Sequence, residues 1–353
     1  MRRKKTVDFL TVTLFFGIIL SMTVYFGLGA ILGGDTEKSS SNINDIFYGD
    51  DALDGFVKDC DYRLFRHINE SDIIIGSDGW LFEATDKESG YDRLLDHIGG
   101  CPFTAAEQKK IANTVSLRKA QYDAVGIEYM MIVIPDSMTV CADKVPRYLG
   151  GQSENKRLTL LNAYLAGEGI SALIDPTEAM LAESGEMSMY NNTENSINAY
   201  GAYCIYNVAV SRFLADTGRE VDRIYYEDIE FFTRITDGKS VAQRTGLAST
   251  IKNKTVSLSD GMLENYTVVS NEKGLVITER GESAARGRGE RVMVECFDDW
   301  DRIQLTPFFS NTFEKVYYRN SFTTSPQSAQ QYGVTFVIQL IHESELHTLL
   351  END

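Results

Sequence analysis

The stretch Gly126-Ile127-Glu128-Tyr129-Met130-Met131-Ile132-Val133-Ile134-Pro135-Asp136-Ser137 contains a run of apolar residues that ends at a proline, which is typical of a buried strand. The run follows Thr104-Ala105-Ala106-Glu107, a capping box that predicts the start of a helix reaching about Ala124. A helix followed directly by a buried strand is one unit of an α/β fold. This stretch therefore predicts that fold class.

The same alternation continues on the carboxyl side. Helical spacing of apolar residues recurs at 156–167 and 202–217, and strand patterns occur at 172–174, 291–297, 315–318 and 336–341. Helices that alternate with strands imply a mainly parallel sheet covered on both faces. In such a sheet, functional groups gather at the carboxyl ends of the strands.

Residues 221–285 depart from this alternation. They contain short strand-like runs at 256–258, 266–270 and 274–278, with turn residues between them. We predict an inserted antiparallel element here.

The amino terminus has the pattern of a membrane anchor. Four cationic residues, Arg2-Arg3-Lys4-Lys5, follow Met1 and precede an apolar run from Val7 to Leu32 in which Asp8 is the only charge. The positive flank favours a cytoplasmic amino terminus. We therefore expect residues 1–5 in the cytoplasm, a transmembrane signal anchor at 6–33, a polar tether at 34–45 and an extracytoplasmic domain at 46–353. A cleaved signal peptide is the alternative, although the apolar run exceeds the usual length and no clear cleavage site follows.

The charge is strongly acidic. The chain carries a net charge of -17, and because residues 1–33 contribute +3, the remainder carries -20. This charge disfavours nucleic acid and anionic lipid surfaces as partners.

Five cysteines are spread along the chain without a Cys-x-x-Cys pair, which argues against a zinc site of that type. Cys60 and Cys101 are the most plausible disulfide in an exported domain. Cys204 and Cys296 lie on an expected helix and strand, where a buried apolar role is favoured.

The segment Tyr190-Asn191-Asn192-Thr193-Glu194-Asn195-Ser196-Ile197-Asn198-Ala199-Tyr200-Gly201-Ala202 resembles a catalytic motif, Tyr-x-x-Asp-Thr-His-Trp-Asn-x-x-Gly-Ala. The motif belongs to the SGNH-hydrolase-like DHHW group, which includes the bacterial alginate O-acetyltransferases of the AlgX and AlgJ type. Asn198, Gly201 and Ala202 match it. Glu194 stands in place of the Asp and Ser196 in place of the His.

The second catalytic segment is altered in the same way. In the family a strand leads into Asp-Ser-Phe, whose Ser is the nucleophile, and then into Leu-x-Pro-Phe. Here the strand at 291–297 leads into Asp298-Asp299-Trp300-Asp301 and then Leu305-Thr306-Pro307-Phe308. Trp300 falls on the position of the Ser, and an indole has no nucleophilic atom.

Three further segments resemble the family, at 72–82, 126–137 and 334–343, so that the resemblance spans about residues 70–350 and covers 220–290 poorly. Without the family, 72–82 reads as a hairpin that turns at Ser77-Asp78-Gly79. The resemblance implies an SGNH-hydrolase-like, flavodoxin-like fold of three layers. It also implies a role in polysaccharide O-acetylation, with a polysaccharide and a membrane-bound O-acyltransferase as partners.

Nucleophilic acyl transfer needs a hydroxyl or thiol beside a base that a third group orients. Since Glu194, Ser196 and Trp300 replace that set, we expect a catalytically inactive accessory or glycan-binding protein rather than an enzyme, with no cofactor and no metal. Trp300 or Trp80 is available to stack on a sugar ring, although Trp80 is more readily explained as a core residue. The predicted rim of the site comprises Asp136, Ser137, Asn198, Asp298, Asp299, Asp301, His342 and Glu343.

Three alternatives remain open from the sequence. The first is an active acyltransferase or esterase with relocated residues, drawing on His342 and a hydroxyl from Ser137, Ser196, Ser310 or Ser321. The second is a cation site or a glycosidase carboxylate pair, formed by Glu194, Asp298, Asp299, Asp301 and Glu343, although their spacing matches no compact calcium loop. The third is a module that binds other proteins.

Overall fold

The structure is a computed structural model that describes Gly17 and residues 51–86, 89–183, 185, 187–272, 274–281, 289–296 and 298–351. The chain divides into two compact units, Met1–Val57 and Lys58–Asp353. The predicted membrane anchor and tether, residues 6–45, lie outside the described residues except for Gly17. Among the described residues, no helix combines the length and the apolar character that crossing a membrane requires.

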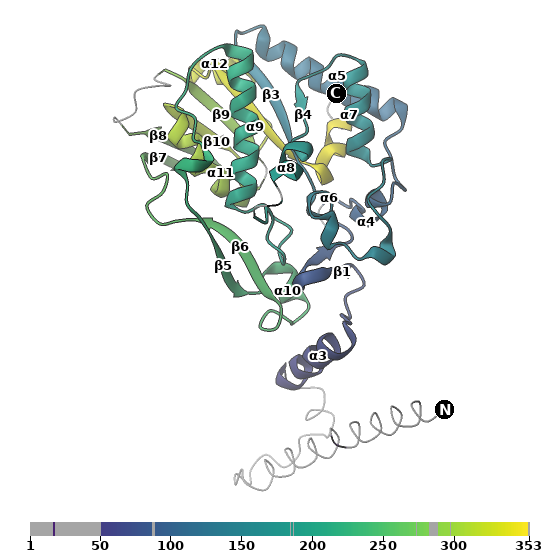
Figure 1. Ribbon diagram of the computed structural model, residues 1–353. Coiled ribbons are helices and arrows are strands. Elements are labelled where there is room, and N and C mark those ends of the chain that lie inside the picture. The colour runs from purple at the N-terminus through teal and green to yellow at the C-terminus, as the bar shows by residue number, and fades with distance from the viewer. Residues whose placement is uncertain are drawn as a thin grey trace, which may run out of the picture. The chain divides into compact units, whose positions relative to one another are not determined.

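A seven-stranded sheet forms the centre of the second unit, in the order β4-β3-β11-β9-β10-β8-β7. The five strands from β4 to β10 are parallel, whereas β8 and β7 continue the sheet as antiparallel strands (Figure 1). The strand bounds are β3 Glu128–Ile134, β4 Leu173–Ile174, β7 Tyr266–Glu272, β8 Leu275–Arg280, β9 Arg291–Cys296, β10 Lys315–Arg319 and β11 Phe336–His342.

Strand β3 shows that both faces of the sheet are covered, because its successive side chains enter different cores. Met130, Ile132 and Ile134 pack in a core with residues of helices α9, Ala199–Thr217, and α11, Asp299–Thr312. Tyr129, Met131 and Val133 pack with α5, Ala105–Asp123, and α7, Arg157–Gly167. A strand that is buried on both faces has a continuous apolar sequence, which explains the run in the sequence.

The remaining helices are short, apart from α3, Asp51–Phe65, which comes before the sheet in the chain. The others are α4 Arg93–His97, α6 Ser137–Val140, α8 Thr177–Glu183, α10 Ser240–Arg244 and α12 Pro326–Gln331, with 3-10 turns η1 Ser77–Gly79, η2 Ala142–Lys144, η3 Arg147–Leu149, η4 Tyr226–Asp228 and η5 Glu343–Leu350.

The predicted hairpin at residues 72–82 is present. Strands β1, Ile73–Ile75, and β2, Leu81–Glu83, pair antiparallel around η1. Asp78 and Gly79 adopt positive φ values of 55° and 82° there, and a glycine accommodates that conformation most easily. Trp80 is 6% exposed and stacks on Phe82, with 5.4 Å between ring centroids, so Trp80 is a core residue.

The predicted insertion at 221–285 is divided between two sheets. Strands β5, Phe231–Asp237, and β6, Lys252–Leu258, form a separate two-stranded ribbon. The hairpin of β7 and β8 instead joins the main sheet beside β10. The prediction of antiparallel strands in this region is correct. The pairing of β8 with β10, a strand more than 30 residues further along the chain, could not be predicted from the local pattern.

Candidate functional site

The carboxyl ends of β3, β9 and β11 are neighbours in the sheet, and an open cleft of about 580 Å³ lies beyond them. The register sets Ile134 beside His342, so the residues that follow the two strands face one another. Because Leu340 lies beside Cys296, the loop that begins α11 comes to the same edge. Parallel strands thus gather side chains from three distant segments. The described residues that line the cleft are Glu83, Asp86, Ser89, Arg93, Ile134, Pro135, Asp136, Glu194, Asn195, Ser196, Asp298, Asp299, His342, Glu343, Ser344, Glu345, His347 and Thr348.

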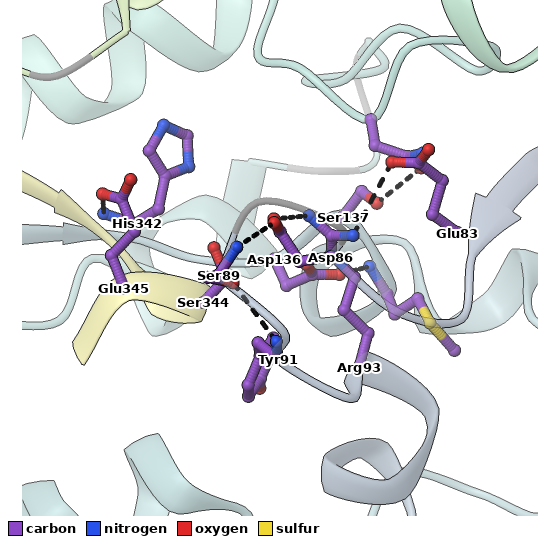
Figure 2. A network of polar contacts seen from close by, with 12 residues as sticks. Glu83, Asp86, Ser89, Tyr91, Arg93, Asp136, Ser137, His342, Ser344 and Glu345 are labelled. Atoms are coloured by element: carbon purple, nitrogen blue, oxygen red, sulfur yellow. Dashed lines mark hydrogen bonds and ion pairs between the residues drawn. The ribbon is translucent and has the colours of Figure 1, made fainter. Parts of the chain in front are cut away.

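Arg93 holds one wall of the cleft together. Its Nε donates to Oδ2 of Asp136 at 2.6 Å and its Nη2 donates to Oδ2 of Asp86 at 2.5 Å, while Glu83 lies 3.6 Å from Nη1 (Figure 2). Burial acts to lower the pKa of Arg93, but the surrounding carboxylates outweigh it and raise that pKa. Asp136 also caps α6, since its Oδ1 accepts from the amide of Met138 at 2.9 Å. Its carboxylate is therefore fixed by two elements.

Glu343 is buried at the floor of the cleft and does not lie at its rim. Its Oε2 accepts from the Asp136 amide and from the Thr139 hydroxyl, each at 2.8 Å. Its Oε1 lies 2.9 Å from Nζ of Lys156, and both side chains are buried. Burial acts to lower the pKa of Lys156, and the charge of Glu343 outweighs it and raises that pKa. The role of Glu343 is to join the ends of β3 and β11.

A histidine and two aspartates meet at the start of α11. Nε2 of His342 lies 2.6 Å from Oδ2 of Asp301. Burial acts to lower the pKa of His342, but the adjacent Asp301 outweighs it and raises that pKa to about 9. Asp298 caps the helix by accepting from the Trp300 amide at 2.6 Å. Asp299 also lines the cleft, and it accepts hydrogen bonds from Asn320 and Arg302, which lower its pKa.

The altered motif positions come together beside this group. Nδ2 of Asn191 donates to Oε2 of Glu194 at 2.9 Å and to Oγ of Ser196 at 3.0 Å, and Oγ of Ser196 lies 3.5 Å from the same carboxylate. Burial raises the pKa of Glu194. Nε1 of Trp300 donates to the carbonyl of Ile197 at 3.0 Å. The two motif segments identified in the sequence are therefore adjacent in space.

The structure places the predicted rim residues in different settings. Asp136, Asp298, Asp299, His342 and Glu343 line the cleft, whereas Ser137, Asn198 and Asp301 do not. Ser137 is buried and donates to Oδ1 of Asn195 at 3.0 Å. Asn198 is a correction to the predicted rim. It is buried as the cap of α9, because its Oδ1 accepts from the amides of Tyr200 and Gly201.

Several site residues were absent from the sequence prediction. Glu83 ends β2, and Asp86 and Arg93 follow that strand in a segment where the sequence shows no clear helix or strand pattern. Glu345 follows the final strand closely, and its Oε2 accepts from the His342 amide at 3.4 Å (Figure 2). The signal that would have found Glu345 is the strand-end rule already applied to His342 and Glu343.

The cysteines take no part in this site. All five are free thiols, so the predicted pair of Cys60 and Cys101 is wrong in this structure. Cys60 lies in the middle of α3 and Cys101 in the loop before α5, where the Cys101 carbonyl accepts from Nε of Arg157. Cys204 and Cys296 are buried in the apolar core, as the sequence predicted.

Comparison with known proteins shows the fold. No family model matches the chain, and no curated protein matches it in sequence. A DHHW family protein from Eubacterium siraeum superposes with a TM-score of 0.51 at 14% identity, over 78% of this chain and 92% of that one. Bacillus cereus PatB1, solved with a sulfonyl adduct, gives a TM-score of 0.51 at 12% identity, over 79% and 96%. The O-acetyltransferase domain of Pseudomonas putida AlgJ gives 0.48 at 11%, over 80% and 93%.

The chain therefore has the mixed α/β fold of the DHHW and PatB1 structures, as the sequence resemblance predicted. The match covers most of both chains, so the likeness extends over a whole domain. Shared fold alone does not determine activity, which depends on the residues of the site.

Proposed function

We propose that this protein has kept the cleft of the SGNH-like acetyltransferase fold without its chemistry, and that it holds a glycan in that cleft as an accessory member of a polysaccharide O-acetylation system. The observation that carries the proposal is the packing of Glu194, Ser196 and Trp300. A serine takes the place of the base, and an indole takes the place of the nucleophile. Trp300 is further engaged with the Ile197 carbonyl.

A relocated active site finds no support among the described residues. The four hydroxyls considered from the sequence all have partners other than histidine: Ser137 bonds Asn195, Ser196 bonds Asn191 and Glu194, Ser310 bonds Thr278 and Tyr318, and Ser321 bonds Thr323. Nε2 of His342 is paired with Asp301, and none of these four hydroxyls is hydrogen-bonded to His342. A serine nucleophile needs a base within hydrogen-bond reach.

The charge of the cleft indicates which glycans suit it. The described lining residues include eight carboxylates and one arginine, and that arginine is itself paired with Asp86 and Asp136. A negative potential repels polyanions and attracts cations. We therefore propose a neutral or amino-bearing glycan rather than a polymer of uronic acids.

Trp300 supplies the surface for a sugar ring at the edge of the cleft: it is not one of the lining residues, but it directly follows Asp298 and Asp299, which are. It is 40% exposed and its ring is held at one edge by the Ile197 carbonyl, whereas Trp80 is enclosed in the core. An exposed aromatic face that is fixed in position loses little conformational freedom when a ligand stacks on it.

The setting that we propose is the outer side of the cell membrane, with the apolar segment 6–33 as a single-pass anchor. From the outer side of the membrane, the domain could contact both a polysaccharide and a membrane-bound O-acyltransferase. The strongly acidic remainder of the chain is consistent with a soluble domain tethered to the membrane.

Glycan binding by the full-length protein, purified in detergent, tests the proposal. Titrations with oligomers of glucosamine, of glucose and of uronic acid are expected to show binding in the first two classes and little in the third. Trp300→Ala is expected to weaken binding about fivefold, since an aromatic contact contributes on the order of 1 kcal/mol.

The matched control is Tyr225→Ala, which removes an exposed aromatic side chain just before η4, a segment that contributes no residue to the cleft. Its affinity should equal that of the unaltered protein. Equal losses in the two variants, or an absence of binding in all three glycan classes, would overturn the proposal.

A further inference from the structure

Three side chains with metal-ligating atoms converge at the edge of the cleft. Asp298 caps the amino terminus of α11, Asp301 lies in the first turn of that helix, and His342 ends β11. One ligand atom from each of the three lies within 4.8 Å of the other two. Asp298 and His342 line the cleft, while Asp301 lies behind them with an exposed fraction of only 1%.

A second observation concerns the carboxylate of Asp301. Its Oδ2 is paired with His342, but its Oδ1 is buried and accepts no hydrogen bond from the described residues. Buried carboxylate oxygens are ordinarily satisfied by donors or by a metal ion. This oxygen therefore has capacity to bind an additional positive group.

The donor set indicates the kind of metal. Calcium and magnesium prefer oxygen ligands alone, whereas an imidazole with carboxylates suits zinc and related transition metals. We propose that Asp298, Asp301 and His342 form a site for a divalent transition metal of the zinc class, with a further coordination position facing the cleft.

The required movement is small. Nε2 of His342 and Oδ2 of Asp301 are 2.6 Å apart. Two ligand atoms that each lie about 2.1 Å from a tetrahedral zinc ion are separated by roughly 3.4 Å. Binding requires the proton between the two groups to leave and the atoms to part by less than about 1 Å. Asp298 lies at the exposed start of α11, where its Oδ1 accepts from the Trp300 amide and leaves its other carboxylate oxygen for the metal.

This site is independent of the glycan proposal, since it depends only on these three ligands. A metal at the cleft edge would nevertheless offer a coordination position to a hydroxyl of any molecule that occupies the cleft. The sequence predicts no metal, and the alternative of a cation site made only of carboxylates does not include His342, which comes from a distant strand.

Calorimetric titration of zinc into the chelator-treated full-length protein tests the site. We expect one zinc ion per chain, and we expect Asp298→Asn to weaken binding at least tenfold. Asparagine caps a helix as well as aspartate does, so this variant should keep its fold. His342→Gln should show a similar loss. Cobalt in place of zinc should give visible absorption typical of a metal held by protein ligands.

Two controls separate the site from general attraction to an acidic surface. Asp299→Asn removes the neighbouring carboxylate, and His347→Gln removes the other histidine that lines the cleft. Both should bind zinc as the unaltered protein does. Absence of zinc binding, or equal affinity in Asp298→Asn and Asp299→Asn, would overturn the proposal whatever the outcome of the glycan titrations.

Discussion

At the scale of single residues, Lys156 and Glu343 form a buried ion pair on which the cleft depends. Replacing Lys156 with Met would leave the Glu343 carboxylate buried beside Thr139 without its cation. Removing one partner of a buried pair typically costs about 3 kcal/mol or more. We expect Lys156→Met to lower the free energy of unfolding by that amount in urea denaturation.

The matched control is Lys144→Met. Lys144 pairs with Asp78 and Asp143 on the surface, where all three side chains are substantially exposed. Exposed pairs contribute at most about 1 kcal/mol. A loss in Lys156→Met no larger than that in Lys144→Met would contradict the anchoring role of Glu343.

Glu295 provides a prediction about pH. It is buried in β9, and burial raises its pKa above the ordinary 4.5, although hydrogen bonds from Thr324 and Gln339 oppose the change. Because the folded state then holds the proton more tightly, the stability from Glu295 is fully present below pH 4.5 and is lost as the pH rises through the raised pKa.

Glu295→Gln removes this titration. We expect the unfolding free energy of the variant, measured relative to the unaltered protein, to increase as the pH rises above 4.5. Chemical denaturation at a series of pH values measures the difference between the two proteins. A difference that is independent of pH would refute the assignment.

Residues at the site were predictable when they directly followed a strand. Asp136 follows β3, Asp298 lies between β9 and α11, and His342 is the last residue of β11. The strand patterns in the sequence therefore located all three residues. Arg93 and Lys156 were not predictable, because ion pairs with Asp136 and Glu343 depend on folding across 43 residues and more. No local pattern encodes such a pairing.

At the scale of elements, α9 is held close to the loop that carries the altered motif. A Cβ on Gly201 would lie 2.4 Å from the Met189 carbonyl oxygen, which belongs to the backbone and cannot rotate away. We expect Gly201→Ala to reduce stability by about 1–3 kcal/mol, as overpacking does, and to displace the loop. Thermal or urea unfolding measures the loss.

Gly167→Ala is the control for helix propensity. Gly167 ends α7, and no atom lies within 4 Å of the position of its Cβ. Alanine there should leave stability unchanged or slightly increase it. Similar effects of the two substitutions on stability would argue against the close approach of α9 to the Met189 carbonyl.

Elements with strong local signals were predicted well. The capping box at Thr104 begins α5, and the expected strand at 127–134 is β3. Helix α11 was not predicted, because Pro307 interrupts its pattern. The Asp298 cap and the first-turn acidic residues explain why the helix forms there despite the proline.

At the scale of the whole molecule, the sequence predicts attachment to a membrane. We expect the full-length protein to remain in the membrane fraction after alkaline washing, and a chain that lacks residues 1–33 to be released. Externally added protease should degrade the domain in spheroplasts while they remain intact. Protection of the domain in intact spheroplasts would contradict the proposed orientation.

We propose that this protein has retained the cleft of its fold and lost acyltransferase activity. The most direct measurement is acetyl release and transfer by the full-length protein, using an acetyl ester donor and an oligosaccharide acceptor, with and without added zinc. We predict no turnover above that of a heat-denatured sample, and the same result for Ser137→Ala and His342→Ala. Turnover by the unaltered protein that is lost in either variant would contradict the claim.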